Sequence, residues 1–396
     1  MKNKRILFAV ITALSAPAFA DTANVTVYGK VDASYDSINT GTATNGTTGV
    51  TSNRVSSNTT YLGFKGSDDL GDGLSGIWQI ESSINVGYSA ATINTVEIGT
   101  RNTFLGLKND SLGTVLAGRH DTPYKLSTRR FDQFADGIAD NRSILGGLAN
   151  VTASATAAGV KGSAAAAFDG RQDQVVAYIS PNLGGLTVAA AHVNLVPTQN
   201  TVAAAQNKNA TSVAAWYDAN GFYGSLAYEV HSDLTVNAAG TATSENATKL
   251  GLGYTLDGVF SIGAVAEKTK DNLAAAASVN GLGGNLYGHS AVYLSGKINV
   301  GSTDAIKLAY TKANTVGNQI GTGARQFSLG FDHSLSKRTT VYVLGTKLIN
   351  QTNAGYSLSG NASVGGASTL PGGTTLNQTV TGASPSAIAI GAKVTF

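Results

Sequence analysis

The sequence predicts an all-β fold, a 16-stranded antiparallel up-and-down transmembrane β-barrel. Three observations lead to this prediction. Charged residues make up only 13% of the 396 residues, whereas glycine is abundant at 48. Apolar and polar residues alternate along many segments with the two-residue period of a strand. Short turn-rich connections alternate with long polar ones, as in outer-membrane barrels, whose turns face the periplasm and whose loops face outside.

The alternation is clearest at the end of the chain, where Ile388, Ile390 and Val394 share one face and Gly391 and Lys393 the other. The same division into an oily face and a polar or glycine face recurs along the chain. In chain order, strands are expected near residues 24–36, 59–67, 74–87, 97–108, 112–120, 171–180, 185–195, 210–218, 221–231, 247–256, 259–269, 287–299, 304–313, 324–334, 338–349 and 386–396.

The first twenty residues are expected to be a signal peptide. Three basic residues within the first five positions precede an apolar run from Ile6 to Leu14, and the segment ends in Ala18-Phe19-Ala20. This order of basic, apolar and small residues predicts export with cleavage after Ala20, rather than a buried N-terminal helix. The expected domains are the signal peptide at 1–20 and a barrel at 21–396, with an inserted third loop at about 121–170.

Charge and composition exclude several classes of protein. The formal net charge is +3, and all three surplus cations belong to the predicted signal peptide. The remaining chain is neutral, whereas a nucleic-acid binder needs a dense basic face. The chain has no Cys, so thiolate metal sites and cysteine nucleophiles are excluded. We expect no metal and no cofactor.

A soluble β-sandwich or a solenoid is the alternative fold. A soluble sandwich turns its apolar faces inward and covers its outside densely with Lys and Glu. Here charge is scarce, and no repeat with the period of a solenoid is evident. The barrel therefore accounts better for the sequence, and the low-complexity segments 150–167 and 351–386 fit its solvent-facing loops.

Several segments resemble, in order, the general porins of Gram-negative bacteria, in particular the trimeric porins of the β-proteobacteria and Neisseria. Residues 25–32 (VTVYGKVD) resemble the first strand of that family, and residues 61–74 (YLGFKGSDDLGDGL) resemble its second strand and first turn. Further matches lie at 101–107, 113–119, 121–123, 178–185 and 335–339, and at the terminal Phe396. The chain departs from the family at Thr60-Tyr61, where the family usually has an Arg, and in an insertion at 143–168.

The resemblance implies an outer-membrane homotrimer whose third loop folds into the barrel and narrows it. Here that loop begins at Asp121 and is unusually charged, although a solvated surface loop is the alternative interpretation. The alternation turns Lys30 and Lys65 inward. Arg101, Arg119 and Arg171 carry over from the family's motifs; the alternation leaves the direction of Arg101 and Arg119 open, and the cost of burying a guanidinium in lipid favours the lumen for each. The predicted lining of the constriction is Lys30, Asp32, Lys65, Glu81, Arg101, Arg119, Asp121, Arg129, Arg130, Asp132, Asp136 and Arg171.

The predicted function is passive diffusion of ions and small hydrophilic solutes, with a weak anion preference motivated by the wall arginines. A channel specific for phosphate or organic anions is the alternative, for which Arg129-Arg130 leaves room. No enzyme is expected. Catalysis would need a set of carboxylate and histidine side chains at one rim of the barrel, and the sequence offers one suggestive pair, His120-Asp121. An adhesin translocator would need a passenger segment ahead of the barrel. The terminal Phe396 resembles the signal read by the outer-membrane assembly machinery.

Overall fold

The computed structural model describes residues 25–86, 98–147, 168–195, 208–232, 242–272, 285, 287–316, 320–358 and 381–396. The predicted signal peptide, its cleavage site at Ala20 and most of the 143–168 segment lie outside these residues. Among the described residues, no helix has the length and apolar character needed to cross a membrane.

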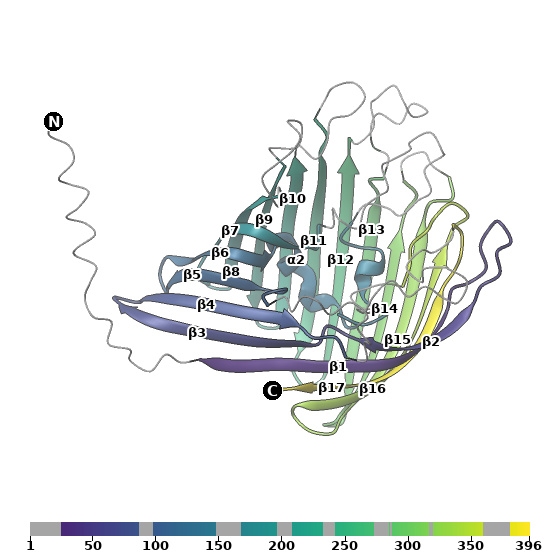
Figure 1. Ribbon diagram of the computed structural model, residues 1–396, viewed down its shortest axis with the longest axis horizontal. Helices are drawn as coiled ribbons and strands as arrows, with labels where there is room; N and C mark the ends of the chain where they lie inside the picture. The colour runs from purple at the N-terminus through teal and green to yellow at the C-terminus, as the bar shows by residue number, and fades with distance from the viewer. Residues whose placement is uncertain are drawn as a thin grey trace.

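The strands form one closed antiparallel ring (Figure 1). Each strand pairs with its neighbours in chain order, and β1 closes on β17, with Lys30 opposite Thr395 and Asn39 opposite Ser386. The described strands and helix are β1 (Thr26–Asn39), β2 (Thr51–Ser57), β3 (Tyr61–Gly71), β4 (Leu74–Ser83), β5 (Thr103–Asn109), β6 (Gly113–Asp121), α2 (Pro123–Thr128), β7 (Arg171–Ile179), β8 (Leu186–Asn194), β9 (Asn209–Ala219), β10 (Phe222–Ser232), β11 (Glu245–Leu256), β12 (Phe260–Asp271), β13 (Ser290–Val300), β14 (Asp304–Ala313), β15 (Ala324–Ser334), β16 (Thr339–Asn350) and β17 (Ser386–Thr395).

The ring is a barrel of 16 strands, because two of the 17 segments in the sheet, β2 and β3, both pair with β1 and share one position. Thr59 interrupts this strand with a φ of 57°. The predicted fold class is therefore confirmed. The two largest boundary errors are at the second strand, which begins at Thr51 instead of residue 59, and at β5, which begins at Thr103 instead of residue 97. The strand predicted at 74–87 also ends earlier, at Ser83. The first error arose because the break at Thr59 resembles the start of a strand.

Tight turns join the strands at one end of the barrel. Asp72-Gly73 has φ values of 53° and 72°, and Asn220-Gly221 has 53° and 79°. Two successive positive φ values define the type I′ turn, which matches the twist of a hairpin and favours Asn-Gly and Asp-Gly. The long connections lie at the opposite end. By the rule for outer-membrane barrels, the tight turns face the periplasm and the long connections face outside.

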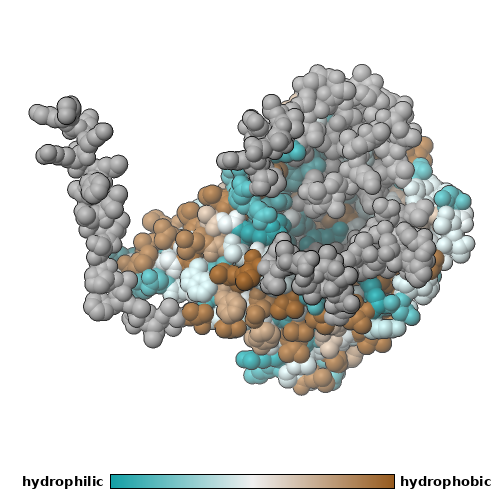
Figure 2. Space-filling view, viewed as in Figure 1, coloured by the Kyte–Doolittle hydropathy of each residue, from teal (hydrophilic) through white to brown (hydrophobic). Residues whose placement is uncertain are grey.

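The outer surface of the barrel is apolar. On β15, Phe327, Leu329 and Phe331 are exposed, whereas Gln326 and Ser328 between them are buried. Figure 2 shows brown, hydrophobic residues over much of the lower outer wall. Such a band suits contact with lipid hydrocarbon, where a closed ring of strands leaves no backbone group unpaired.

Candidate pore constriction

The segment that follows β6 enters the barrel instead of extending from its rim. We call residues 122–147 the constriction loop. It begins with α2, whose first turn is capped by the Thr122 side chain accepting a hydrogen bond from the Lys125 amide. The helix contacts β8, β9, β10 and β11, and Figure 1 shows it inside the ring of strands. Short 3₁₀ turns follow at Arg129–Phe131 and Asn141–Ser143.

The constriction loop is held against the wall by two phenylalanines that pack on glycines. A Cβ added to Gly251, Gly253 or Gly263 would lie closer than 3.0 Å to ring carbons of Phe131. These glycines of β11 and β12 therefore form a recess that only a residue without a side chain can provide. Phe134 packs in the same way on β15, where a Cβ on Gly330 would lie 2.8 Å from its ring. Both rings are buried.

A second attachment joins both ends of the loop to β12. The Tyr124 hydroxyl donates a hydrogen bond to Glu267 at 2.8 Å, and the Gly146 amide donates to the same carboxylate at 2.9 Å. Lys249 of β11 lies 3.6 Å from Glu267 and forms an ion pair with Asp169. Because the buried Glu267 carboxylate accepts hydrogen bonds from both ends of the loop, it holds the two ends together against β12.

Two of the loop's acids stabilise the loop itself. Asp140 is fully buried and forms ion pairs with Arg142 at 3.0 Å and Arg129 at 3.3 Å. Asp132 accepts hydrogen bonds from the Phe134 amide and the Tyr293 hydroxyl. Burial and the neighbouring Asp140 raise the pKa of Asp132. The structure therefore uses these carboxylates as internal supports instead of presenting them to the lumen.

Asp136 carries the loop's charge to the opposite wall. Its carboxylate lies 3.0 Å from Lys30 Nζ on β1 and also pairs with Arg129. Around this contact, a cavity of about 330 Å³ separates residues 132–138 of the loop from the wall formed by β1 and β14–β17. Asp32, on the same wall, is buried and accepts a hydrogen bond from Tyr342 at 2.8 Å. The loop and the wall thus meet across a narrow polar gap.

Next to this gap lies a cluster of aromatic and charged side chains. Glu81 accepts a hydrogen bond from Tyr28 at 3.0 Å and pairs with Arg101. The Arg101 guanidinium lies 4.7 Å from the centre of the Tyr61 ring, and Lys30 lies 6.0 Å from it. At these distances a ring face attracts a cation. The Tyr61 ring therefore lies within reach of two cations, Lys30 and Arg101.

Arg171 and Asp121 form a second charged cluster at the entry to the loop. Arg171 Nε lies 3.2 Å from Asp121, whose other partner is Lys125 Nζ at 2.7 Å. Burial lowers the pKa of Lys125 to about 8, although Asp121 opposes the change. Arg171 also donates to the Asn102 side chain at 2.7 Å.

The remaining predicted residues lie apart from the gap. Arg119 sits at a register shift between β6 and β7 and pairs with Asp173. Arg130 points to β9, where it lies 2.5 Å from Asp218. Lys65 is on the inner face and lies 5.2 Å from the centre of the Tyr28 ring. The structure therefore brings together only part of the predicted set.

Three wall lysines were missed by the sequence prediction. Lys297 is opposite Lys307 in the register of β13 and β14, and Lys393 is opposite Asp32 in that of β17 and β1. All three lie on inner-facing positions, and Lys307 pairs with Asp332 at 2.8 Å. The two-residue alternation already puts Lys393 on the face opposite Val394, and it places Lys307 between Ile306 and Leu308 and Lys297 next to Ile298. These lysines were nevertheless left out of the predicted constriction.

Comparisons with known proteins agree with this architecture. The sequence profile of the family described as Gram-negative porin matches residues 8–353. The major outer membrane protein P.IA of Neisseria meningitidis serogroup B is 26% identical over 92% of this chain and 98% of its own length. The anion-selective porin from Comamonas acidovorans superposes with a TM-score of 0.70 at 22% identity, covering 94% of this chain and 100% of the other. The trimer form of Vibrio cholerae OmpT has a TM-score of 0.59 at 13% identity, covering 95% and 100%. The chain therefore belongs to the Gram-negative porin family, which forms channels in the bacterial outer membrane.

Proposed function

We propose that this protein is a passive diffusion channel of the outer membrane for ions and small hydrophilic solutes, with a weak preference for anions. The observation that carries the proposal is the constriction loop, which is docked inside a 16-stranded barrel. A barrel of this size is too wide for side chains to fill, so water occupies it and the narrowest point selects the solute. That point is the polar cavity between residues 132–138 of the loop and the wall of β1 and β14–β17, beside the Asp136–Lys30 ion pair.

The anion preference rests on the balance of paired and unpaired charge. Most charges near the gap are neutralised locally, as in the pairs of Arg101 with Glu81 and Arg171 with Asp121. Among the described residues, Lys297 and Lys393 have no ion-pair partner within 4.0 Å. Uncompensated positive charge along a water-filled lumen raises the local concentration of anions. The name of the structural neighbour from Comamonas acidovorans, an anion-selective porin, is in keeping with this preference.

A channel specific for phosphate or organic anions remains the second candidate from the sequence. Such a channel needs free cations at its narrowest point. Arg129 is engaged by Asp136 and Asp140, and Arg130 by Asp218. These pairs remove the two arginines that favoured the specific channel, so the general porin is the better proposal.

We also propose that the protein has no catalytic activity. The His120 ring nitrogen Nδ1 contacts the backbone oxygen of Asp121 at 2.7 Å instead of its carboxylate. That carboxylate is already paired with Lys125 and Arg171. The pair therefore lacks the arrangement in which a carboxylate orients a histidine for proton transfer.

The proposal further includes export after removal of residues 1–20, a homotrimer in outer-membrane lipid, and assembly by the machinery that reads Phe396. Family membership and the trimer form of OmpT support the trimer. The backbone of Phe396 pairs with Gly29 through two hydrogen bonds, of 3.0 and 3.1 Å. The end of β17 is thus paired with β1, where the barrel closes.

Replacing Phe396 with Ala should reduce the amount of folded protein in cell outer membranes severalfold while leaving refolding in detergent nearly unchanged. The backbone pairing with Gly29 does not require the ring, whereas recognition by an assembly factor does. Heat-modifiable mobility on gels measures both quantities. An equal loss in cells and in detergent would mean that the ring serves barrel closure alone.

Recording from the refolded protein in planar bilayers tests the main proposal. We expect stable, ohmic conductance in three equal steps per inserted unit, and a reversal potential of anion-preferring sign in a salt gradient. Silence at all voltages would contradict the channel itself. A cation-preferring reversal potential would contradict only the proposed selectivity.

A further inference from the structure

The outer face of the barrel carries a group of cations at its extracellular end. Lys312 on β14, Arg325 on β15 and Lys347 on β16 are exposed and share the outward face with Leu308, Phe327 and other apolar residues. Lys312 is directly opposite Arg325, and Lys347 is opposite Phe327, two residues further along β15. Facing pairs lie about 5 Å apart and diagonal pairs about 7–8 Å apart, so one anion can contact all three. We call these residues the cation triad.

Among the residues that the structure describes, no carboxylate neutralises the triad. Like charges directly opposite each other destabilise a pair of strands. None of the three is within 4.0 Å of a carboxylate among the described residues. Residues 272–289, 314–323 and 351–385, which connect the strands at this end, contain no Asp or Glu in the sequence. An anion from outside the chain can therefore supply the counter-charge.

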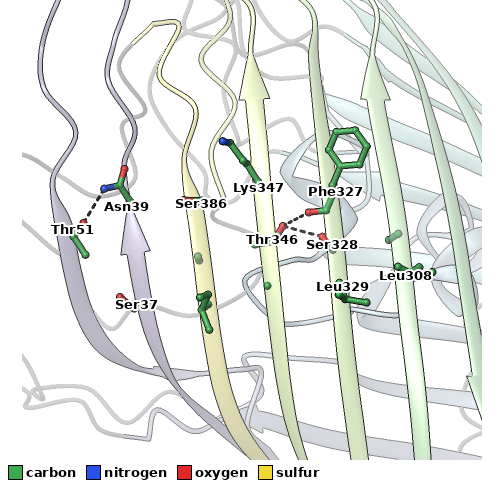
Figure 3. Close-up of a pocket in the computed structure, with 14 residues that line it drawn as sticks. Ser37, Asn39, Thr51, Leu308, Phe327, Ser328, Leu329, Thr346, Lys347 and Ser386 are labelled. Carbon is green, nitrogen blue, oxygen red and sulfur yellow. Dashed lines mark hydrogen bonds between the residues drawn. The ribbon is translucent and has the colours of Figure 1, made fainter. Parts of the chain in front are cut away.

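An apolar groove lies next to Lys347 of the triad (Figure 3). It has a volume of about 640 Å³ and runs across β14–β17 and β1. Phe327, Leu329 and Ile388 flank it, and Lys347 lies at its upper end. Gly345 forms part of its floor, where an added Cβ would meet no atom within 4 Å. The barrel wall thus has an unfilled depression that continues from the charged rim into the lipid-facing band.

We infer that this surface binds one phosphorylated membrane lipid, with its phosphate on the cation triad and one acyl chain in the groove. The triad lies at the extracellular boundary of the apolar band, which is the depth of a headgroup in the outer leaflet. A phosphate accepts hydrogen bonds from several cations at once, and Arg binds it in a bidentate manner. A second copy of the chain would need carboxylates to neutralise the triad. An apolar partner would leave three charges desolvated, so the lipid is the better occupant.

Native mass spectrometry of the detergent-solubilised protein, titrated with dipalmitoyl phosphatidic acid, tests this inference. The wild-type protein should retain one lipid. The combined variant Lys312→Gln, Arg325→Gln, Lys347→Gln should bind about a hundredfold more weakly, at roughly 1 kcal/mol for each cation lost near a lipid surface. The variant Lys268→Gln, Lys270→Gln, which removes two cations, is the control, because both lysines are exposed on the outward face of β12. It should bind within about twofold of the wild type.

The variant Gly345→Leu separates a lipid from a free anion. Leu at this position has room to fold and fills the groove, so lipid binding should fall about tenfold, since each buried methylene contributes about 0.8 kcal/mol. Inorganic phosphate should not displace the lipid. Displacement by inorganic phosphate, together with normal lipid binding by Gly345→Leu, would reduce the site to a phosphate site and overturn the inference. An equal loss of lipid binding in the triad variant and in the control would also overturn the inference. Dissociation of the oligomer by Gly345→Leu would overturn it as well, because the groove would then be a contact between subunits.

Discussion

Adding one methyl group at each of Gly253 and Gly263 should release the constriction loop from the wall and raise both the mean conductance and the current noise of the open channel. The new methyl groups would occupy the space of the Phe131 ring. Overpacking costs about 1–3 kcal/mol per site, whereas burying a phenylalanine contributes only about 1.5–3 kcal/mol. The double variant therefore removes about as much free energy as the anchor supplies. Single-channel recording measures the result.

A mutant cycle with Phe131→Ala shows whether the effect acts through the ring. In the Phe131→Ala background a methyl group at Gly263 should have little further effect, because the three atoms nearest to it all belong to Phe131. At Gly253 a residual effect is expected, since the Ile262 carbonyl oxygen still lies 2.7 Å from the added Cβ. Gly296→Ala is the control on the outer face of β13, since the atom nearest to its added Cβ is the Ser261 backbone oxygen at 3.9 Å, and it should conduct as the wild type does. Unchanged conductance in both Phe131→Ala and the double glycine variant would contradict the role of the loop as the constriction.

Replacing Lys297, Lys307 and Lys393 with Gln should convert the weak anion preference into a cation preference. A unit charge at 4 Å contributes about 1 kcal/mol in water. Removing three should lower the anion-to-cation permeability ratio by about tenfold at low salt. The change also leaves Asp332 without its 2.8 Å partner Lys307, which adds negative charge to the lumen. Reversal potentials in a salt gradient measure this ratio.

Salt dependence and a control variant on the outer face make the test specific. The shift should shrink in concentrated salt, where the Debye length falls to about 3 Å. Lys268→Gln with Lys270→Gln removes cations from the outer face of β12, and it should leave the reversal potential near that of the wild type. If the outer-face variant shifts selectivity as far as the lumen variant, the ion preference does not arise from the lumen lysines.

The strand alternation predicted most of the barrel, because it is a local property of the pleated backbone. Successive side chains point to opposite faces, so Ile388 and Lys393 are assigned to opposite sides from ten residues of sequence. The break at Thr59 could not be recognised in this way. The short polar segment around it resembles a loop. Only the pairing of β2 and β3 with the same strand, β1, shows that the two segments form a single interrupted strand.

The candidate site was less accessible from sequence. The charge-rich segment after Asp121 indicated the constriction loop, but the sequence does not distinguish the roles of Asp132, Asp136 and Asp140. The structure turns the first two into supports within the loop and directs the third to Lys30. Likewise, Gly253 and Gly263 resemble any inner-face glycine until Phe131 is placed on them.

The sequence alone was therefore enough for the fold class and the division into lipid-facing and lumen-facing residues. It also placed the charge in a single inserted loop. Which charges remain unpaired in the lumen was decided by the tertiary structure. The physical reason is the separation along the chain of the residues that interact. The pleat acts between neighbours in the chain, whereas the contacts of Phe131 with β11 and of Asp136 with β1 join residues about a hundred or more positions apart. Such pairs form only after the ring closes and the loop comes to rest on its inner wall.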